Sequence, residues 1–177
     1  YPVFNGTDYD LYFGQADGSG TRLFQNGASQ PDFSHDGARI AYRSWRPDQR
    51  GIVTADISGD NLLIVASFFE DQLPTWTADN TDIVFLSRRS GDRKSQLLRV
   101  NSLQNLGQGI VIGEGEYPAI SPTGLMAFKG WGNTGTGLRT STADLDVVQP
   151  LTEANEDTAP APSPDGQKVA FMSRRAG

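Results

Sequence analysis

The sequence predicts an all-β fold: a β-propeller, or a propeller segment, of about four four-stranded sheets. The first observation behind this prediction is a pattern of proline, apolar residue and turn that recurs four times. Its leading prolines lie 43, 44 and 42 residues apart, and they are Pro31, Pro74, Pro118 and Pro160. This period fits one four-stranded propeller blade and is too long for leucine-rich repeats. The second observation is that apolar residues alternate with a period of two, and no window shows the period of a helix.

The N-terminal stretch matches the end of a blade. Residues 9–14 and 21–24 fit its third and fourth strands, joined by a turn at residues 17–20 that is rich in Gly, Ser and Asp. Val3 and Phe4 fit the end of the second strand of the same blade.

Three repeats follow, at about residues 30–72, 73–116 and 117–158. In the second of them the sequence predicts four strands, at residues 74–77, 83–87, 96–100 and 110–112. Large and small side chains alternate along each second strand, as in Ile83-Val84-Phe85. This alternation fits a sheet that is packed on both faces by neighbouring sheets. Because proline cannot donate a ladder hydrogen bond, we expect each leading proline at the first position of its strand.

Residues 159–177 supply a first and a second strand. Pairing with residues 1–29 would complete a split blade and close the propeller, which removes exposed sheet edges. The alternative is an open segment that self-associates through those edges. Val3 and Phe4 would be redundant in a closed ring, and this redundancy favours the open segment.

Composition excludes several classes of function. The 15 basic and 21 acidic residues give a net charge of −6, which argues against nucleic acid as a partner because a duplex binder needs a dominant positive field. The chain has no cysteine, so a disulfide framework, a thiolate nucleophile and a cysteine-based zinc site are excluded. No apolar run approaches the roughly 18 residues that span a bilayer, so we expect no direct membrane insertion.

Two motifs carry a family resemblance. Pro-x-Phe-Ser-x-Asp-Gly-x-x-Ile-Ala-Tyr at residues 31–42 and Ala-Asp-Gly-Ser-Gly-Thr-Arg-Leu at residues 16–23 resemble the repeats of TolB-like propellers. Similar repeats occur in the propeller domains of prolyl oligopeptidase-type peptidases. The resemblance implies a non-catalytic, periplasmic scaffold of bacterial type that binds other proteins. TolB-like proteins usually have six blades and an additional domain, whereas this sequence carries about four repeats.

Catalytic and metal-binding motifs are missing from the sequence. The single histidine, His35, lies in a predicted hairpin turn without a second group that would make a triad or a metal site. No nucleophile elbow, zinc-protease motif or phosphate-binding loop occurs. The Asp-Gly pairs fit turns and do not fit calcium loops. We therefore expect no catalytic residues, no metal and no cofactor.

One group of residues recurs at equivalent positions after the second strand of each repeat. We predict that these side chains share one face of the propeller, the loop face, and bind a protein or peptide there, since Arg and Trp are enriched at binding hot spots. They are Trp45, Arg46, Arg88, Arg89, Trp131, Arg174 and Arg175. Three of the four loops that enter a first strand on the same face are acidic. In the alternative interpretation, the arginines pair locally with these acids as solvated surface.

The predicted function is a non-catalytic scaffold for protein–protein interaction. One alternative is the gating propeller of a serine peptidase whose hydrolase domain lies elsewhere. A second is carbohydrate binding, because Trp45, Trp76 and Trp131 could stack on sugars. Trp76 aligns with Phe33 and Ile120 in other repeats, however, and this alignment favours a core position.

Overall fold

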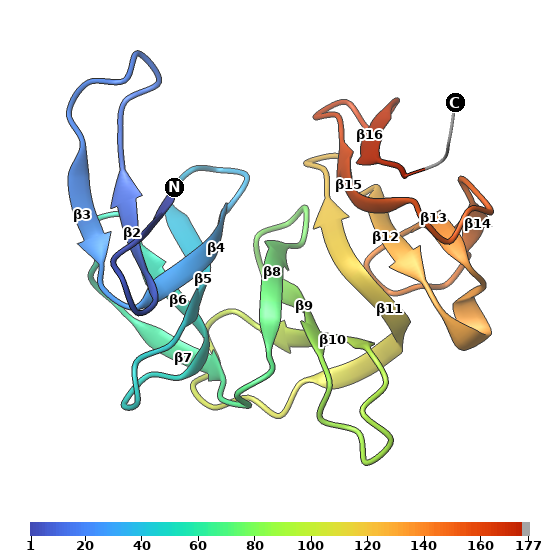
Figure 1. Ribbon diagram of the computed structural model, residues 1–177, viewed down its shortest axis with the longest axis horizontal. Helices are drawn as coiled ribbons and strands as arrows, with labels where there is room; N and C mark the ends of the chain where they lie inside the picture. The colour runs from blue at the N-terminus through green and yellow to red at the C-terminus, as the bar shows by residue number, and fades with distance from the viewer. Residues whose placement is uncertain (175–177) are drawn as a thin grey trace.

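The computed structural model describes residues 1–174, and the regular structure of these residues is β-strand apart from one 3₁₀ helix of three residues. The strands form antiparallel sheets that follow one another along an arc from the N-terminal sheet to the C-terminal hairpin (Figure 1). Strands that are adjacent in sequence pair with each other in every sheet, as the short turns between them favour. The predicted all-β fold class is confirmed.

The first sheet contains β1 (Pro2–Phe4), β2 (Tyr9–Phe13) and β3 (Arg22–Gln25). The second contains β4 (Ala28–Phe33), β5 (Arg39–Ser44), β6 (Gly51–Asp56) and β7 (Leu63–Ala66). The third begins with β8 (Gln72–Trp76), β9 (Asp82–Ser87), β10 (Gln96–Asn101) and β11 (Ile110–Ile120). It continues from β11 into β12 (Met126–Gly130), the short 3₁₀ helix η1 (Gly132–Thr134), β13 (Gly137–Ser141) and β14 (Gln149–Pro150). The last hairpin consists of β15 (Thr158–Pro162) and β16 (Val169–Met172).

Strand β11 joins two four-stranded units into one seven-stranded sheet. Its first half pairs with β10 up to Glu114, and its second half pairs with β12 from Gly115 onward. The sequence predicted two separate strands here, and the structure corrects this. Glycine permits the continuous strand, because a Cβ at Gly115 would lie 2.8 Å from the ring of Phe128. The strand thus passes directly from the outer edge of one unit to the first position of the next.

Side chains of β5 and β9 pack alternately into two different cores, whereas Ala170 and Phe171 of β16 are exposed. Ile40 and Tyr42 of β5 belong to the core against the first sheet, whereas Ala41 between them belongs to the core shared with β8, β9 and β10. All three residues are fully buried. A large side chain buried in this way contributes about 1.5–3 kcal/mol. The predicted packing on both faces is confirmed for β5, and β9 and β12 carry the same fully buried pattern.

The sequence predicted each leading proline at the first position of its strand, and the structure corrects this prediction. Each proline lies inside its strand at a β-bulge. The pairing register with the neighbouring strand shifts between the residues that flank it. A bulge leaves one residue unpaired, so a proline there costs no ladder hydrogen bond. The residue before each proline has a positive φ, between 48° and 55°, in a region that side chains other than glycine rarely adopt. These four residues are Gln30, Leu73, Tyr117 and Ala159.

The first strands of successive units are connected by hydrogen bonds that repeat with the sequence period. The Leu73 N–H donates to Gln30 Oε1 at 2.9 Å, and the Trp76 N–H donates to Asp32 Oδ2 at 2.9 Å. The Ile120 N–H donates to Thr75 Oγ1 at 3.3 Å. Side chains of one unit therefore satisfy backbone donors of the next.

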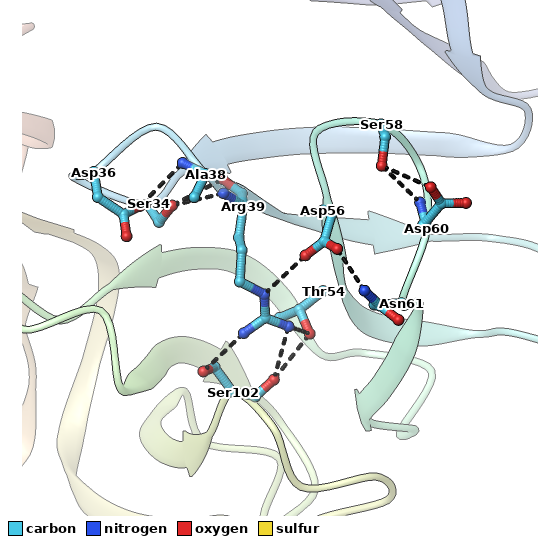
Figure 2. A network of polar contacts seen from close by, with 10 residues as sticks. All are labelled: Ser34, Asp36, Ala38, Arg39, Thr54, Asp56, Ser58, Asp60, Asn61 and Ser102. Carbon is cyan, nitrogen blue, oxygen red and sulfur yellow. Dashed lines mark hydrogen bonds and ion pairs between the residues drawn. The ribbon is translucent and has the colours of Figure 1, made fainter.

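Arg39 of β5 makes a second connection between the same two units (Figure 2). Its guanidinium donates to Ser102 Oγ at 3.2 Å, to the Ser102 carbonyl at 3.3 Å and to Thr54 Oγ1 at 2.9 Å. Asp56 lies 3.8 Å from its Nε, and the guanidinium carbon lies 5.2 Å from the centre of a ring of Trp76. Ser102 lies between β10 and β11, so one side chain links β5 to the far edge of the next unit.

The two ends of the described chain stay in separate sheets. β1, β2 and β3 pair only with one another within residues 1–174, and β15 pairs only with β16. The closing pairing of the N- and C-terminal strands does not form in this structure. β1 pairs with β2 as the second strand that Val3 and Phe4 predicted. Figure 1 shows the N-terminal sheet and the C-terminal hairpin at the two ends of the arc.

Candidate functional site

The predicted binding residues occupy equivalent positions in the fold. Trp45 follows β5, Arg88 follows β9 and Trp131 follows β12, each directly after the last residue of the second strand. These loops therefore lie at the same end of their sheets. Arg174, two residues after β16, is exposed, and Arg175 lies outside the described residues.

The two central arginines are bound to acidic residues that the sequence predicted in the entering loops. Arg88 donates to Glu116 at 3.0 Å and to Ser95 Oγ at 3.1 Å. Arg89 donates to Asp71 at 2.6 Å, and the Asp71 side chain is fully buried. The interpretation in which arginines pair locally with the acids therefore describes Arg88 and Arg89. Their donors are used in bonds within the protein, which restricts what they could offer a partner.

The first loop of the predicted set is also tied down locally. The indole N–H of Trp45 donates to Ser29 Oγ at 3.2 Å, and the guanidinium carbon of Arg43 lies 3.6 Å from the centre of its ring. Arg46 pairs with Asp48 at 3.2 Å on the surface. Such an exposed pair contributes little to stability. The structure does not bring this loop and the Trp131 loop together around a common cavity.

Trp131 lines a cavity of about 400 Å³ at the junction where β11 changes partners. We call this the junction cavity. Three segments form it: the loop between β9 and β10, the middle of β11, and the start of η1. Its lining residues are Arg93, Lys94, Ser95, Glu114, Glu116, Trp131 and Gly132.

Charges in the junction cavity are arranged by depth. The Glu114 and Glu116 side chains are 24% and 15% exposed, whereas Arg93 and Lys94 are each 63% exposed. Arg93 is paired with Glu70, and Lys94 lies 3.1 Å from Asp92 and 3.8 Å from Glu114. The carboxylates thus form the floor and the two cations form the rim.

Glu116 is held in its ionised form. Burial raises the pKa of the Glu116 carboxyl, but the hydrogen bonds from Ser95 and Arg88 and the charge of Arg88 outweigh burial and lower it below its ordinary value. Ser95 Oγ donates at 2.6 Å and Arg88 at 3.0 Å, both to the same oxygen, Oε1. A carboxylate has about four acceptor positions, so Glu116 keeps acceptor capacity beyond these two bonds.

Sequence reasoning named Trp131 but did not assign the rest of this cavity. Glu114 and Glu116 were recognised only as acidic loop residues, whereas both lie within β11. Their spacing of two residues was an available signal, because alternate residues of a strand share a face. Arg93, Lys94 and Ser95 gave no sequence signal, since their place in the cavity depends on the path of the loop between β9 and β10.

Trp76 and His35 were considered from the sequence for sugar binding and for catalysis, and both make structural contacts. Trp76 is fully buried, as its alignment with core residues predicted, and its indole N–H donates to the Asp32 carbonyl at 3.1 Å. The backbone N–H of His35, in the turn between β4 and β5, donates at 2.7 Å to Oδ1 of Asn80 in the equivalent turn of the next unit. No group of three or more metal-ligating side chains gathers within residues 1–174. Within residues 1–174, no helix has the length and the apolar character needed to cross a membrane.

No protein-family model matches the sequence, and no curated protein matches it. Solved structures do match. TolB from Acinetobacter baumannii is 19% identical with a TM-score of 0.78, and the match covers 96% of this chain and 44% of that one. The structure of “putative TolB” from Agrobacterium tumefaciens is 18% identical with a TM-score of 0.73, covering 97% and 68% of the two chains. The propeller domain of the Trilobed protease from Pyrococcus furiosus is 11% identical with a TM-score of 0.62, covering 98% and 58%.

These matches concern the fold, because all the identities are low. The chain spans less than half the length of the first TolB structure and about two thirds of the second. The repeated prolines, the alternating second strands and the successive antiparallel sheets agree with this architecture. The chain has the fold of a TolB-like β-propeller.

Proposed function

We propose that this chain is a non-catalytic module that binds a protein or peptide on the loop face, at the junction cavity. The observation that carries the proposal is the cavity itself. An aromatic ring and ionised groups of both signs surround about 400 Å³ of open volume at the junction of two four-stranded units. Aromatic and charged groups that converge in this way are typical of hot spots in protein interfaces.

The proposal changes which residues carry binding. Trp131 keeps its predicted role, and the lining residues Lys94, Glu114 and Glu116 join it. Arg88 supports Glu116 from behind the cavity. Arg89, with its bond to buried Asp71, acts in folding.

A selection from a random peptide library, displayed on phage, tests this proposal with the purified chain. We expect enriched peptides whose affinity falls at least about tenfold in Trp131→Ala, as for a hot-spot residue. Trp45→Ala is the matched control, because Trp45 occupies the equivalent loop of another unit outside the cavity. Asp60→Ala probes the opposite end of the sheets. Failure to enrich any peptide, or equal loss of affinity in all three variants, would contradict the proposal.

Two other functions, an enzymatic activity and a gating role in a peptidase, make different predictions. Solved structures with this fold include enzymes, among them an oligogalacturonate lyase, so the purified chain should be assayed for lyase and peptidase activity. We expect background rates only. A gating role in a peptidase predicts a hydrolase segment with a nucleophile elbow in the intact open reading frame.

A further inference from the structure

We infer that the junction cavity receives the side chain of a lysine or arginine from the partner. This inference rests on the proposed function and names the chemistry of its ligand. It follows from four features of the cavity: the depth of its carboxylates, the state of Glu116, the aromatic wall, and the glycine beside Glu114.

The depth of the charges decides the sign of the ligand. Both cations of the lining are rim residues, and each has an acidic neighbour of its own, Glu70 for Arg93 and Asp92 for Lys94. The carboxylates of Glu114 and Glu116 lie deeper. A positive end group that reaches the floor complements these carboxylates. Glu116 is already paired with Arg88 at 3.0 Å, so Glu114, with its nearest cation 3.8 Å away, offers the freer negative charge.

The carboxylates retain acceptor positions for such a group. At Glu116, Arg88 and Ser95 both donate to Oε1, and the lowered pKa keeps the group charged at neutral pH. At Glu114, Oε2 accepts the Asn133 N–H at 3.2 Å, and Lys94 Nζ stands 3.8 Å from Oε1. The second contact is too long for a hydrogen bond, so an incoming cation could replace Lys94 there while Lys94 keeps Asp92.

The aromatic wall favours a cation as well. The Lys129 ammonium already lies 4.8 Å from the centre of the Trp131 ring. Tryptophan attracts cations more strongly than the other aromatic residues, and the attraction grows when water is excluded. The aliphatic part of a lysine or arginine side chain would cover the apolar wall while its charge reaches the floor.

Gly132 fixes the position of the Glu114 carboxylate. A Cβ on Gly132 would lie 1.7 Å from Glu114 Oε2, and its φ of +51° is a conformation that suits glycine. Only the missing side chain allows the carboxylate to lie against this backbone and accept the Asn133 N–H. The acidic floor is therefore preorganised by the local sequence, which lowers the cost of binding.

The test uses the indole resonances of the three tryptophans in the ¹⁵N-labelled chain, with Trp131→Phe to assign the relevant signal. The probes are four capped tripeptides, glycine on both sides of Arg, Lys, Gln or Glu, together with maltose as a neutral sugar. At concentrations up to about 10 mM, which detect weak binding, we expect the Arg and Lys probes to shift the Trp131 signal saturably. The Gln and Glu probes and maltose should leave it unchanged.

Glu114→Gln should weaken binding of the Arg probe about fivefold or more, because it removes one charge and keeps an acceptor for Asn133. Asp48→Asn removes the same charge from the loop after β5, which is equivalent to the cavity loop between β9 and β10, and should have no effect. A Trp131 signal that responds to the Glu probe or to maltose, or that ignores every probe, would overturn the inference, as would binding unaffected by Glu114→Gln. Library peptides that depend on Trp131 but contain no Lys or Arg would overturn it while leaving the proposed function intact.

Discussion

Arg39 offers the most direct perturbation of the contact between successive units. Arg39→Ala removes three hydrogen bonds from a largely buried guanidinium to Ser102 and Thr54 (Figure 2). Hydrogen bonds from charged donors contribute about 1.5–3 kcal/mol each when they are lost singly. The total here should be smaller, because Thr54 Oγ1 still donates to the Ser102 carbonyl at 3.0 Å and keeps that acceptor satisfied. Burial also lowers the pKa of Arg39, which means that the wild-type charge carries a desolvation cost.

We therefore expect Arg39→Ala to lower the free energy of unfolding by about 2 kcal/mol, which corresponds to a fall in Tm of about 4–8 °C for a chain of this size. The assay is urea unfolding followed by tryptophan fluorescence, with Trp76 next to Arg39 as a local reporter. Arg50→Ala, at an exposed position, is the matched control and should change stability by less than about 0.5 kcal/mol. If the two variants lose the same small amount, Arg39 is ordinary surface and our reading of the network is wrong.

Substitutions at two further residues, Asp32 and Gly132, test the acid beneath Trp76 and the cavity floor. Asp32→Ala should cost about 1–3 kcal/mol because it leaves the Trp76 N–H without its acceptor, whereas Asp32→Asn keeps an acceptor and should be neutral or stabilising at pH 7. Burial raises the pKa of Asp32, so the contribution of this residue to the free energy of unfolding should rise as pH falls through the raised pKa. Asp32→Asn should lack this pH dependence. Equal losses of stability in Asp32→Ala and Asp32→Asn would refute this account. Gly132→Ala should displace the Glu114 carboxylate and weaken binding of the Arg probe about fivefold, with a stability loss of about 1 kcal/mol, and unchanged probe binding would count against a preorganised floor.

Much of the fold could be predicted from the sequence because the period and the alternation are local signals repeated four times. The large-small-large pattern at Ile40, Ala41 and Tyr42 reports directly on packing between two sheets. The bulges could not be predicted in the same way. A proline is compatible with both a strand start and a bulge, and only the pairing partner, seen in the register shift around Pro31, distinguishes them.

The candidate site was predicted only in part. Repeat equivalence placed Trp45 and Trp131 at the same end of their sheets, but equivalence in topology says nothing about what each side chain contacts. Trp45 is covered by Arg43, whereas Trp131 faces a cavity that exists because β11 runs on from one unit into the next. That continuity depends on pairing across the whole sheet, and the sequence carried no signal for it.

The central claim is that a partner binds the loop face at the junction cavity. Photo-cross-linking tests it most directly, with benzoylphenylalanine placed either at position 93, on the rim of the cavity, or at position 123, the exposed turn at the opposite end of β12. The tightest library peptide should cross-link to the chain labelled at position 93 and not to the chain labelled at position 123. Cross-linking from position 123 alone, or equally from both, would place binding elsewhere and contradict the account.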